Sequence, residues 1–144
     1  MTQGGVTGGE ELARNFAKVG KELFSETEKA IEAACLFVEG EAKKKAPVDT
    51  GLLRNSISHR VRSLPLQVVG EVGSATEYAA YQEFGTGIYA KDGNGRKTPW
   101  FVALPNDDRF WTHGAEPKPF LTPAVNENKS KIVRIIEKFL KRKL

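Results

Sequence analysis

Apolar residues recur along the first third of the chain at the period of a helix. From Glu10 to about Lys45 they are spaced by three and four positions, which places them on one helical face. These residues are Leu12, Phe16, Val19, Leu23, Ala30 or Ile31, Ala34 and Val38. The opposite face carries charged residues such as Glu28, Glu32 and Glu39, and we expect it to be solvated. The pattern predicts a long amphipathic helix.

The predicted helix is longer than one small domain needs. At 1.5 Å per residue, a helix of about 36 residues extends about 54 Å, more than a domain of this size requires to cover its core. We therefore expect part of the helix to pack on something else. Gly20 and Gly40 leave a second interpretation open, two shorter helices, because each glycine costs about 1 kcal/mol relative to alanine in a helix interior.

The helix should end at a corner formed by residues 46–58. Pro47 has no amide hydrogen and pushes the residue before it out of the helical region. Asp49-Thr50-Gly51 can then turn the chain, since Asp and Thr side chains bond nearby backbone amides and Gly51 can adopt positive φ. Local chemistry alone predicts a helix-to-strand connection here and no activity.

Two pairs of strands follow. Residues 57–62 and 66–73 alternate between apolar and polar positions, the period of a half-buried strand, and residues 63–65 supply a turn between them. Residues 100–104 and 109–112 have the composition of strands and are separated by a Pro-Asn-Asp-Asp turn. An isolated hairpin is marginal in water, so we expect both hairpins to join one antiparallel sheet.

A short helix is predicted between the two hairpins. Residues 75–84 have helical character, and Ser74 or Thr76 could cap their start. The Gly-Thr-Gly sequence at 85–87 should stop this helix. The segment 88–99 that follows is polar and glycine-spaced, which predicts an exposed loop suited to contacts with other molecules.

The last helix should begin with Thr122 as N-cap and Pro123 at its first position. Its expected buried side consists of Val125, Ile132, Ile135, Ile136, Phe139 and Leu140. The predicted fold class is α+β, with the long N-terminal helix and the C-terminal helix packed on an antiparallel sheet of about four strands. Residues 1–9 should form a flexible lead-in and residues 10–144 a single domain.

Composition and charge narrow the classes of protein to consider. The net charge is +4, but 18 acidic residues lie among 22 basic ones, unlike in a dedicated nucleic-acid binder. The single cysteine, Cys35, rules out an internal disulfide. No apolar run approaches the roughly 18 residues of a membrane span, and the glycine-rich start lacks the apolar centre of a signal peptide. We expect a soluble, intracellular protein with no membrane partner.

Residues for catalysis or metal binding do not form a recognisable constellation. His59 and His113 have no metal-ligand spacing with Cys35 or with a carboxylate pair. Turn chemistry accounts for the acidic pair at 107–108, and neither glycine-rich segment carries the residues of a phosphate-binding loop. We therefore expect no enzymatic activity, no cofactor and no metal. A small hydrolase using either histidine is an alternative that requires a pocket with a perturbed titratable group.

Three stretches together resemble a known family. They are Ala-Pro-Val-Asp-Thr-Gly-Leu-Leu-Arg-Asn-Ser-Ile at 46–57, residues 72–87 with their Glu-Phe-Gly-Thr-Gly ending, and Pro-Phe-Leu-Thr-Pro-Ala at 119–124. In this order they are similar to the tail-component family of tailed bacteriophages and prophages, over about residues 10–144. The residues that carry the resemblance are Pro47, Asp49, Thr50, Gly51, Tyr78, Glu83, Gly85, Thr86, Pro119, Phe120 and Pro123.

The resemblance implies a structural protein of the virion, a neck or tail-completion protein at the head-tail junction. It implies a homo-oligomeric ring, six-fold or twelve-fold, around the DNA channel, with head-closure and tail-tube proteins as neighbours and only transient, non-specific contact with DNA. Before assembly, the protein would be in the host cytoplasm. The motif residues would then fix geometry, and the loop 88–99 would meet adjacent subunits. Its candidate contact residues are Lys91, Asp92, Asn94, Arg96 and Lys97.

An alternative from another class is a small basic DNA-binding accessory protein of a mobile element. It depends on the basic pI of about 9.2 and on an arginine-rich first hairpin. The residues that could meet phosphates are Arg54, Arg60, Arg62, Lys91, Arg96 and Lys97. The chain shows neither a recognition-helix motif nor an aromatic strip for stacking bases, which disfavours this alternative.

Overall fold

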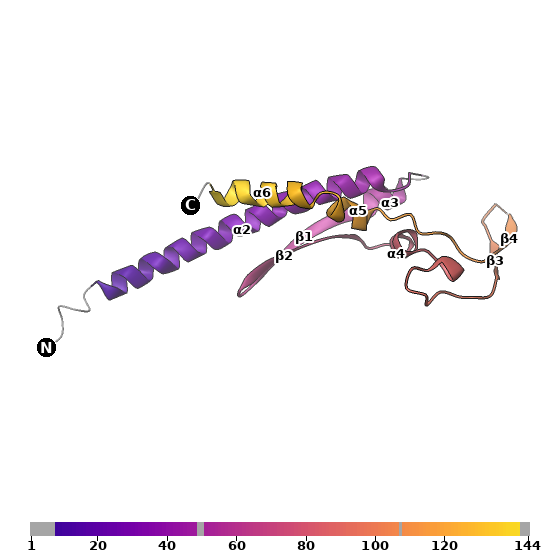
Figure 1. Ribbon diagram of the computed structural model, residues 1–144, viewed down its shortest axis with the longest axis horizontal. Coiled ribbons are helices and arrows are strands. Elements are labelled where there is room, and N and C mark those ends of the chain that lie inside the picture. Colours follow the sequence, from indigo (N-terminus) through magenta and orange to yellow (C-terminus); the bar gives the residue numbers. More distant parts are fainter. Residues whose placement is uncertain (1–7, 49–50, 107, 142–144) are drawn as a thin grey trace.

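A single long helix runs through the molecule. A computed structural model describes residues 8–48, 51–106 and 108–141. Helix α2, Gly9–Lys45, contains 37 residues without a break at Gly20 or Gly40. The prediction of one continuous helix is therefore confirmed, and the alternative of two shorter helices is wrong. Figure 1 shows α2 as the longest element, with its N-terminal half extending beyond the rest of the chain.

The C-terminal half of α2 lies between two layers. On one side is the hairpin of β1, Ile57–Leu64, and β2, Gln67–Ser74, and on the other are the C-terminal helices α5, Leu121–Asn126, and α6, Lys129–Lys141 (Figure 1). The buried residues of α2 are Ala30, Ala34, Cys35, Val38 and Ala42. Most are small, so both layers approach the helix closely. The predicted α+β class is confirmed.

The core is concentrated near the C-terminal end of α2. Its largest fully buried side chains are Phe120 and Ile57. Around them lie Val38, Ala42, Ala46, Leu53, Ala79 and Ala124, which come from four helices and the segment that ends α2. Residues far apart in sequence therefore meet where the chain turns from helix to hairpin.

The corner contains a helical turn that the sequence analysis did not predict. Helix α2 ends at Lys45 and Ala46 is extended, as expected before Pro47. Gly51 has φ +76°, and helix α3, Leu52–Ser56, follows it. Arg54 of this helix donates a hydrogen bond of 2.9 Å to the carbonyl oxygen of Lys43, which lies in the last turn of α2. Asp49 and Thr50 lie outside the described residues.

The strands pair as two separate hairpins. In the first, Ile57 pairs with Ser74 and Leu64 with Gln67, so the tight turn is at 65–66 and not at 63–65. The predicted strand start at Leu66 is wrong, because Leu66 occupies the turn and is 98% exposed. The second hairpin, of β3, Trp100–Ala103, and β4, Arg109–Thr112, is a sheet of its own.

The expectation of one four-stranded sheet is therefore wrong in its strand pairing. Helix α4, Glu77–Phe84, the short 3-10 helix η1, Gly87–Tyr89, and the loop after it come between the hairpins. They carry β3 and β4 to the end of the molecule opposite the N-terminus (Figure 1). The predicted short helix is confirmed, although Thr76 at its N-cap makes no side-chain capping bond.

The C-terminal helical region begins earlier than predicted and is divided. Phe120, not Thr122, is the N-cap of α5. The carbonyl oxygen of Ala124 accepts a hydrogen bond of 2.9 Å from the buried Asn128 side chain, between α5 and α6. Of the six predicted apolar residues, five are half-buried, and Val125 is 42% exposed.

A glycine in β2 permits the hairpin to approach α2. A Cβ atom added to Gly70 would come within 2.3 Å of Cys35 Sγ and 2.8 Å of Ile31 Cγ2. We therefore expect Gly70→Ala to lower the free energy of unfolding by about 1 to 3 kcal/mol, the usual cost of overpacking. Urea denaturation followed by circular dichroism measures this effect.

Gly73→Ala is the matched control, because Gly73 lies in the same strand and an added Cβ has nothing within 4 Å. We expect it to change stability by less than about 0.5 kcal/mol. Equal destabilisation by both substitutions would contradict the assigned close approach at Gly70.

Candidate functional site

The buried carboxylate of Glu83 joins two of the sequence motifs. Glu83 lies in the last turn of α4 and is 4% exposed. Its Oε2 accepts hydrogen bonds from the backbone amides of Phe120 at 2.7 Å and Leu121 at 3.0 Å. Its Oε1 accepts one from the amide of Thr122 at 2.8 Å. A side chain from one helix therefore caps the N-terminus of another.

This cap leaves no backbone donor of the first turn of α5 unsatisfied. A helix N-terminus normally presents four amides without an intrahelical partner. Three of them donate to Glu83, and the fourth position is Pro123, which has no amide hydrogen. The negative charge also lies at the positive end of the helix dipole. This arrangement explains why the helix begins at Leu121.

The pKa of Glu83 reflects two opposing effects. Burial raises the pKa, because it disfavours the charged carboxylate. Hydrogen bonds from Thr122, Leu121 and Phe120 lower the pKa and outweigh burial. The pKa of Glu83 therefore lies below its ordinary value of 4.5. At neutral pH the cap is therefore charged.

The residues after α4 form a second connection to the segment before α5. The amide of Thr86 donates to the carbonyl of Ala115, and the amide of Ala115 donates to Thr86 Oγ1, both at 2.9 Å. Gly85 has φ +78°, and an added Cβ would come within 2.8 Å of the carbonyl oxygen of Tyr89. Glycine is required here both by conformation and by space.

The structure brings most of the motif residues to one junction. Glu83, Gly85 and Thr86 are connected to the segment that leads into Phe120 and Pro123, as described above. Pro119 is exposed next to the buried Phe120. The corner at 46–58 packs against this junction through the shared core, since Ala46 and Leu53 belong to the same cluster as Phe120. The side chain of Tyr78 is not part of the buried junction, because it is 51% exposed on α4.

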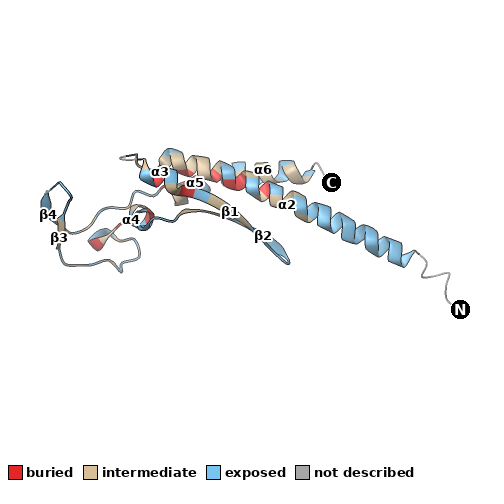
Figure 2. Cartoon of the chain, turned by 180° about the vertical axis from the view of Figure 1, so that it is seen from behind, coloured by how far each residue is buried: buried red, intermediate tan, exposed pale blue. Residues whose placement is uncertain are grey.

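Helix α2 has an apolar surface that none of the other described residues covers. We call Leu12, Phe16, Val19 and Leu23 the apolar ridge; all four are exposed, and Phe16 is 69% exposed. All residues from Gly9 to Leu23 are exposed. Figure 2 shows this half of α2 as one continuous exposed stretch beyond the hairpin. The sequence predicted both the apolar face that contains the ridge and a helix longer than its own domain needs.

A second uncovered apolar surface lies at the opposite end of the molecule. What we call the terminal groove is a depression of about 800 Å³ between α4 and the second hairpin. The residues that line it include Tyr78, Tyr81, Trp100, Val102, Phe110 and Thr112. The last four share one face of the second hairpin, since Trp100 pairs with Thr112 and Val102 with Phe110. The opposite face carries Phe101 and Trp111, whose rings are 5.7 Å apart in an edge-to-face arrangement.

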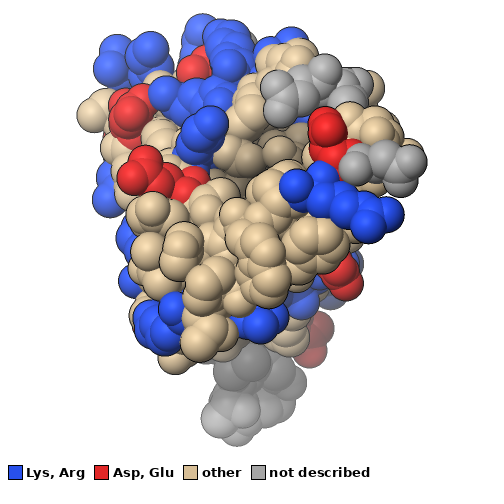
Figure 3. All heavy atoms as spheres, turned by 90° about the vertical axis from the view of Figure 1, so that its right-hand side faces the viewer, with Lys and Arg blue, Asp and Glu red and all other residues tan. Residues whose placement is uncertain are grey.

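The predicted contact loop lies beside this groove. The guanidinium of Arg96 lies 5.7 Å from the centre of the Trp100 ring, a cation-π contact. Asp92 accepts a hydrogen bond of 3.0 Å from the amide of Asn94 and so shapes the loop. Lys91 and Lys97 are exposed. In Figure 3, which views this end, charged side chains of both signs, more of them basic than acidic, surround a middle region that is mostly uncharged.

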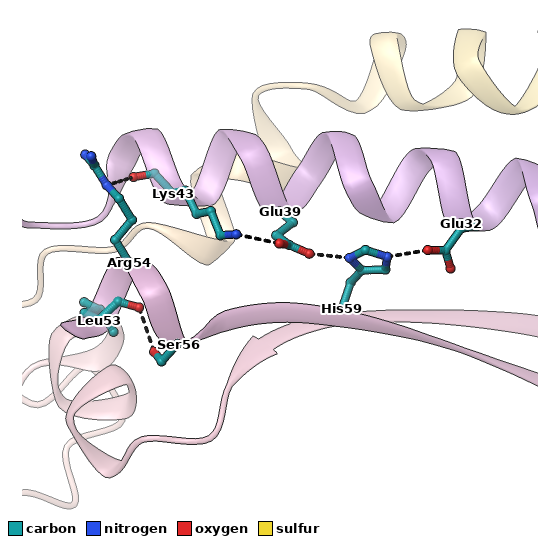
Figure 4. Close-up of polar contacts among 7 residues, drawn as sticks. All are labelled: Glu32, Glu39, Lys43, Leu53, Arg54, Ser56 and His59. Carbon is teal, nitrogen blue, oxygen red and sulfur yellow. Dashed lines mark hydrogen bonds and ion pairs between the residues drawn. The ribbon is translucent and has the colours of Figure 1, made fainter. Parts of the chain in front are cut away.

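His59 connects the first hairpin to α2, a contact that the sequence analysis missed. Its Nδ1 contacts Glu39 Oε2, and its Nε2 lies 2.6 Å from Glu32 Oε1 (Figure 4). The two glutamates are seven residues apart on one helical face, and His59 is on the inward face of β1. These positions together could have predicted the contact. Glu39 is half-buried, not fully solvated as expected.

The ionic state of this contact follows from its neighbours. Hydrogen bonding to Glu32 and then to Glu39 raises the pKa of His59 above its ordinary value of 6.5, against the opposing effect of burial. The pKa of Glu39 is lowered, first by its hydrogen bond with Lys43 and next by that with His59. The contact is therefore an ion pair at pH 6.5 and below, and it remains one over a range above pH 6.5.

The structure offers no assembled metal site or membrane span among the residues that it describes. Across 8–48, 51–106 and 108–141, no three His, Cys, Asp or Glu side chains gather as metal ligands do. None of the described helices combines the length and the apolar character needed to cross a bilayer. His113 is exposed, and Asp107 lies outside the described residues.

Comparison with known families agrees with the first two motifs. Residues 10–85 match the model of the HK97-gp10-like family, described as "Bacteriophage HK97-gp10, putative tail-component". The chain belongs to this family. The match includes the corner and ends at Gly85, so the third motif at 119–124 lies outside it. No curated protein and no solved structure matches the chain.

Membership of the HK97-gp10-like family makes this a structural bacteriophage protein. The matched residues include α2 with its uncovered ridge, the corner, the first hairpin and Glu83. The terminal groove and the helix that Glu83 caps are built largely from residues after the match.

Replacing the buried cap should destabilise the fold. In Glu83→Gln one of the two acceptor oxygens becomes an NH2 group that faces backbone amides. We expect the free energy of unfolding to fall by about 2 to 4 kcal/mol, because buried donors lose a charged acceptor. Urea denaturation measures it, and Glu77→Gln, an exposed position of the same helix, is the control.

The same variant should change the acid sensitivity. The folded pKa of Glu83 is lowered, so its stabilisation is present above the ordinary pKa of 4.5 and is lost as pH falls through the folded value. Stability of Glu83→Gln should therefore fall less steeply than that of the wild type below pH 4.5. Parallel acid dependence of the two proteins would contradict the assigned anionic cap.

The His59 contact predicts the opposite pH dependence. Because the folded pKa is raised, its stabilisation is fully present below pH 6.5 and is lost as pH rises through the higher folded value. We expect thermal stability of the wild type to decline over that range and His59→Gln to remove this part of the decline. His113→Gln, at an exposed position, is the control; an unchanged wild-type slope in His59→Gln would disprove the assignment.

Proposed function

We propose that this chain is a head-tail connector, a neck or tail-completion protein, that forms a ring around the DNA channel at the head-tail junction of a phage or prophage particle. The family supports a structural role in the virion. The observation that carries the finer proposal is the presence of two different uncovered apolar surfaces, the apolar ridge and the terminal groove, at opposite ends of one elongated chain (Figure 1).

Two different surfaces on one chain favour a closed ring. When one surface of a subunit binds a different surface of the next, every contact repeats with the same rotation, and the assembly closes if that rotation divides a full turn. A two-fold dimer would instead bury one surface against its own copy. Six-fold or twelve-fold closure at the head-tail junction would match the symmetry of the neighbouring components.

The remaining partners follow from the same position in the virion. Head-closure and tail-tube proteins would contact the two faces of the ring, and DNA would pass through its channel. Acidic and basic side chains are interspersed, which suits passage of DNA because tight binding to phosphates would hold it back. The proposed role is structural, with no catalytic step.

The alternative of a DNA-binding accessory protein loses part of its basis. It depended on the arginines of the first hairpin, and two of these contact the same carboxylate. Arg60 Nε and Arg62 Nη2 each lie 2.5 Å from an oxygen of Glu71. This pairing reduces the positive charge that the hairpin offers to phosphates.

The oligomeric state of the full chain tests the proposal. We expect light scattering coupled to size exclusion to show a discrete species of six or twelve subunits at high protein concentration, and negative-stain microscopy to show a central channel. Short duplex DNA at physiological salt should not change the mass. A monomer or dimer that takes up duplex DNA stoichiometrically would overturn the proposal in favour of the DNA-binding alternative.

A further inference from the structure

We propose that the terminal groove of one copy receives the apolar ridge of α2 from the next copy. This inference rests on the proposed ring and names the contact that would build it. The occupant is a second copy of this chain, bound through residues 9–23. The contact is a helix in a groove, in which side chains spaced by three and four positions anchor an amphipathic helix.

The ridge has the geometry of such an anchor. Leu12, Phe16, Val19 and Leu23 are spaced by four, three and four positions, so they form a narrow stripe along one face. The helix is continuous through all four, and each side chain is exposed. The backbone that presents the stripe is formed before any partner arrives, which lowers the ordering cost of binding.

The groove has the complementary shape and chemistry. It is concave and is formed by the second hairpin on one side and α4 on the other. Most of the surface that lines it is apolar, as in sites that bind apolar groups, although Arg96 and Glu116 also line it. An isolated two-stranded hairpin is marginal in water, and within the described part of the chain β3 and β4 pair only with each other. A helix seated in the groove would bury one apolar face of the hairpin.

Charges at the two surfaces are also complementary. The first turn of α2 is acidic, with Glu10 and Glu11. The loop beside the groove is basic on balance, because exposed Lys91, Arg96 and Lys97 outnumber its one acidic residue, Asp92. With the ridge in the groove, the acidic turn can lie toward this loop. Rim charges of opposite sign fix the direction of the helix and speed association.

The contact has to form between two copies. The ridge and the groove lie at opposite ends of the molecule, with the core between them (Figures 1 and 2). One chain therefore leaves both surfaces uncovered. A series of copies covers every ridge and every groove except at free ends, and a closed ring leaves no free ends.

Disulfide trapping between two full-length variants tests this contact. We would mix Phe16→Cys protein with Phe110→Cys protein and oxidise the mixture at the concentration used for light scattering. Both positions are exposed in the single chain, whereas the native Cys35 is buried and should not react. Phe16→Cys mixed with Leu66→Cys, at the exposed hairpin tip, is the matched control. We expect a cross-linked product in the first mixture and none in the control.

Whether a ring-sized fraction forms, and whether it contains the cross-link, distinguishes failure of this contact from failure of the proposed function. A cross-link within a discrete ring supports both, and a ladder of cross-linked chains with no discrete ring supports the contact alone. A ring without the cross-link overturns the contact and leaves the proposed function standing. Absence of both overturns both. Equal cross-linking to Phe110→Cys and Leu66→Cys also overturns the contact.

A charge in the ridge supplies an independent measurement. Phe16→Asp should weaken self-association by at least about 30-fold, the effect of losing an aromatic hot spot. Because Phe16 is 69% exposed in the single chain, the fold should be unchanged by circular dichroism. Leu66→Asp changes an apolar residue outside both surfaces that is even more exposed, at 98%, and should associate as the wild type does. Equal weakening by both variants would overturn the contact.

Discussion

The rest of the structure depends on one buried carboxylate. Glu83 ends α4 and caps α5, so it determines where the C-terminal helices start and how they meet α2. Without an internal acceptor, the amide of the buried Phe120 would lose its hydrogen bond at a cost, because water could not replace the carboxylate there. The charge is in turn stable because it faces a helix N-terminus. The carboxylate satisfies the amides of the helix N-terminus, and the amides stabilise the buried charge of the carboxylate.

The same junction holds the second half of the chain in place. Thr86 and Ala115 connect the segments before and after the second hairpin, and the amide of Lys118 donates to the carbonyl of Gln82 at 2.8 Å. The segment from residue 88 to residue 112 therefore begins and ends at neighbouring points in the structure. This arrangement projects a hairpin far from the core while its base is fixed by backbone hydrogen bonds.

Local patterns predicted much of the fold. The period of the apolar residues gave α2, Pro47 gave its end, and alternation gave the first hairpin apart from its turn. The separation of the two sheets could not be predicted, since nothing in either strand pair states whether the other lies beside it. The start of α5 was misplaced because Thr122 looked like a cap. The actual cap comes from a residue 37 positions away from Phe120, which only the tertiary structure brings near. Of the candidate site, the ridge was visible in the sequence, and the groove was not, because it combines α4 with both strands of the second hairpin.

The exposed half of α2 affects how readily contacts between subunits could form and separate. From Gly9 to Glu22 the helix has no buried residue, and isolated helices of about this length are only marginally stable in water. These turns are helical in the single chain, but no tertiary contact among the described residues buries them, so they open more readily than the buried part of α2. In the proposed ring, part of the energy of each contact would be spent on holding this segment helical, which would keep encounters between free subunits reversible. Wrongly joined subunits could then separate, and the completed ring, in which all contacts act together, would be the state that persists.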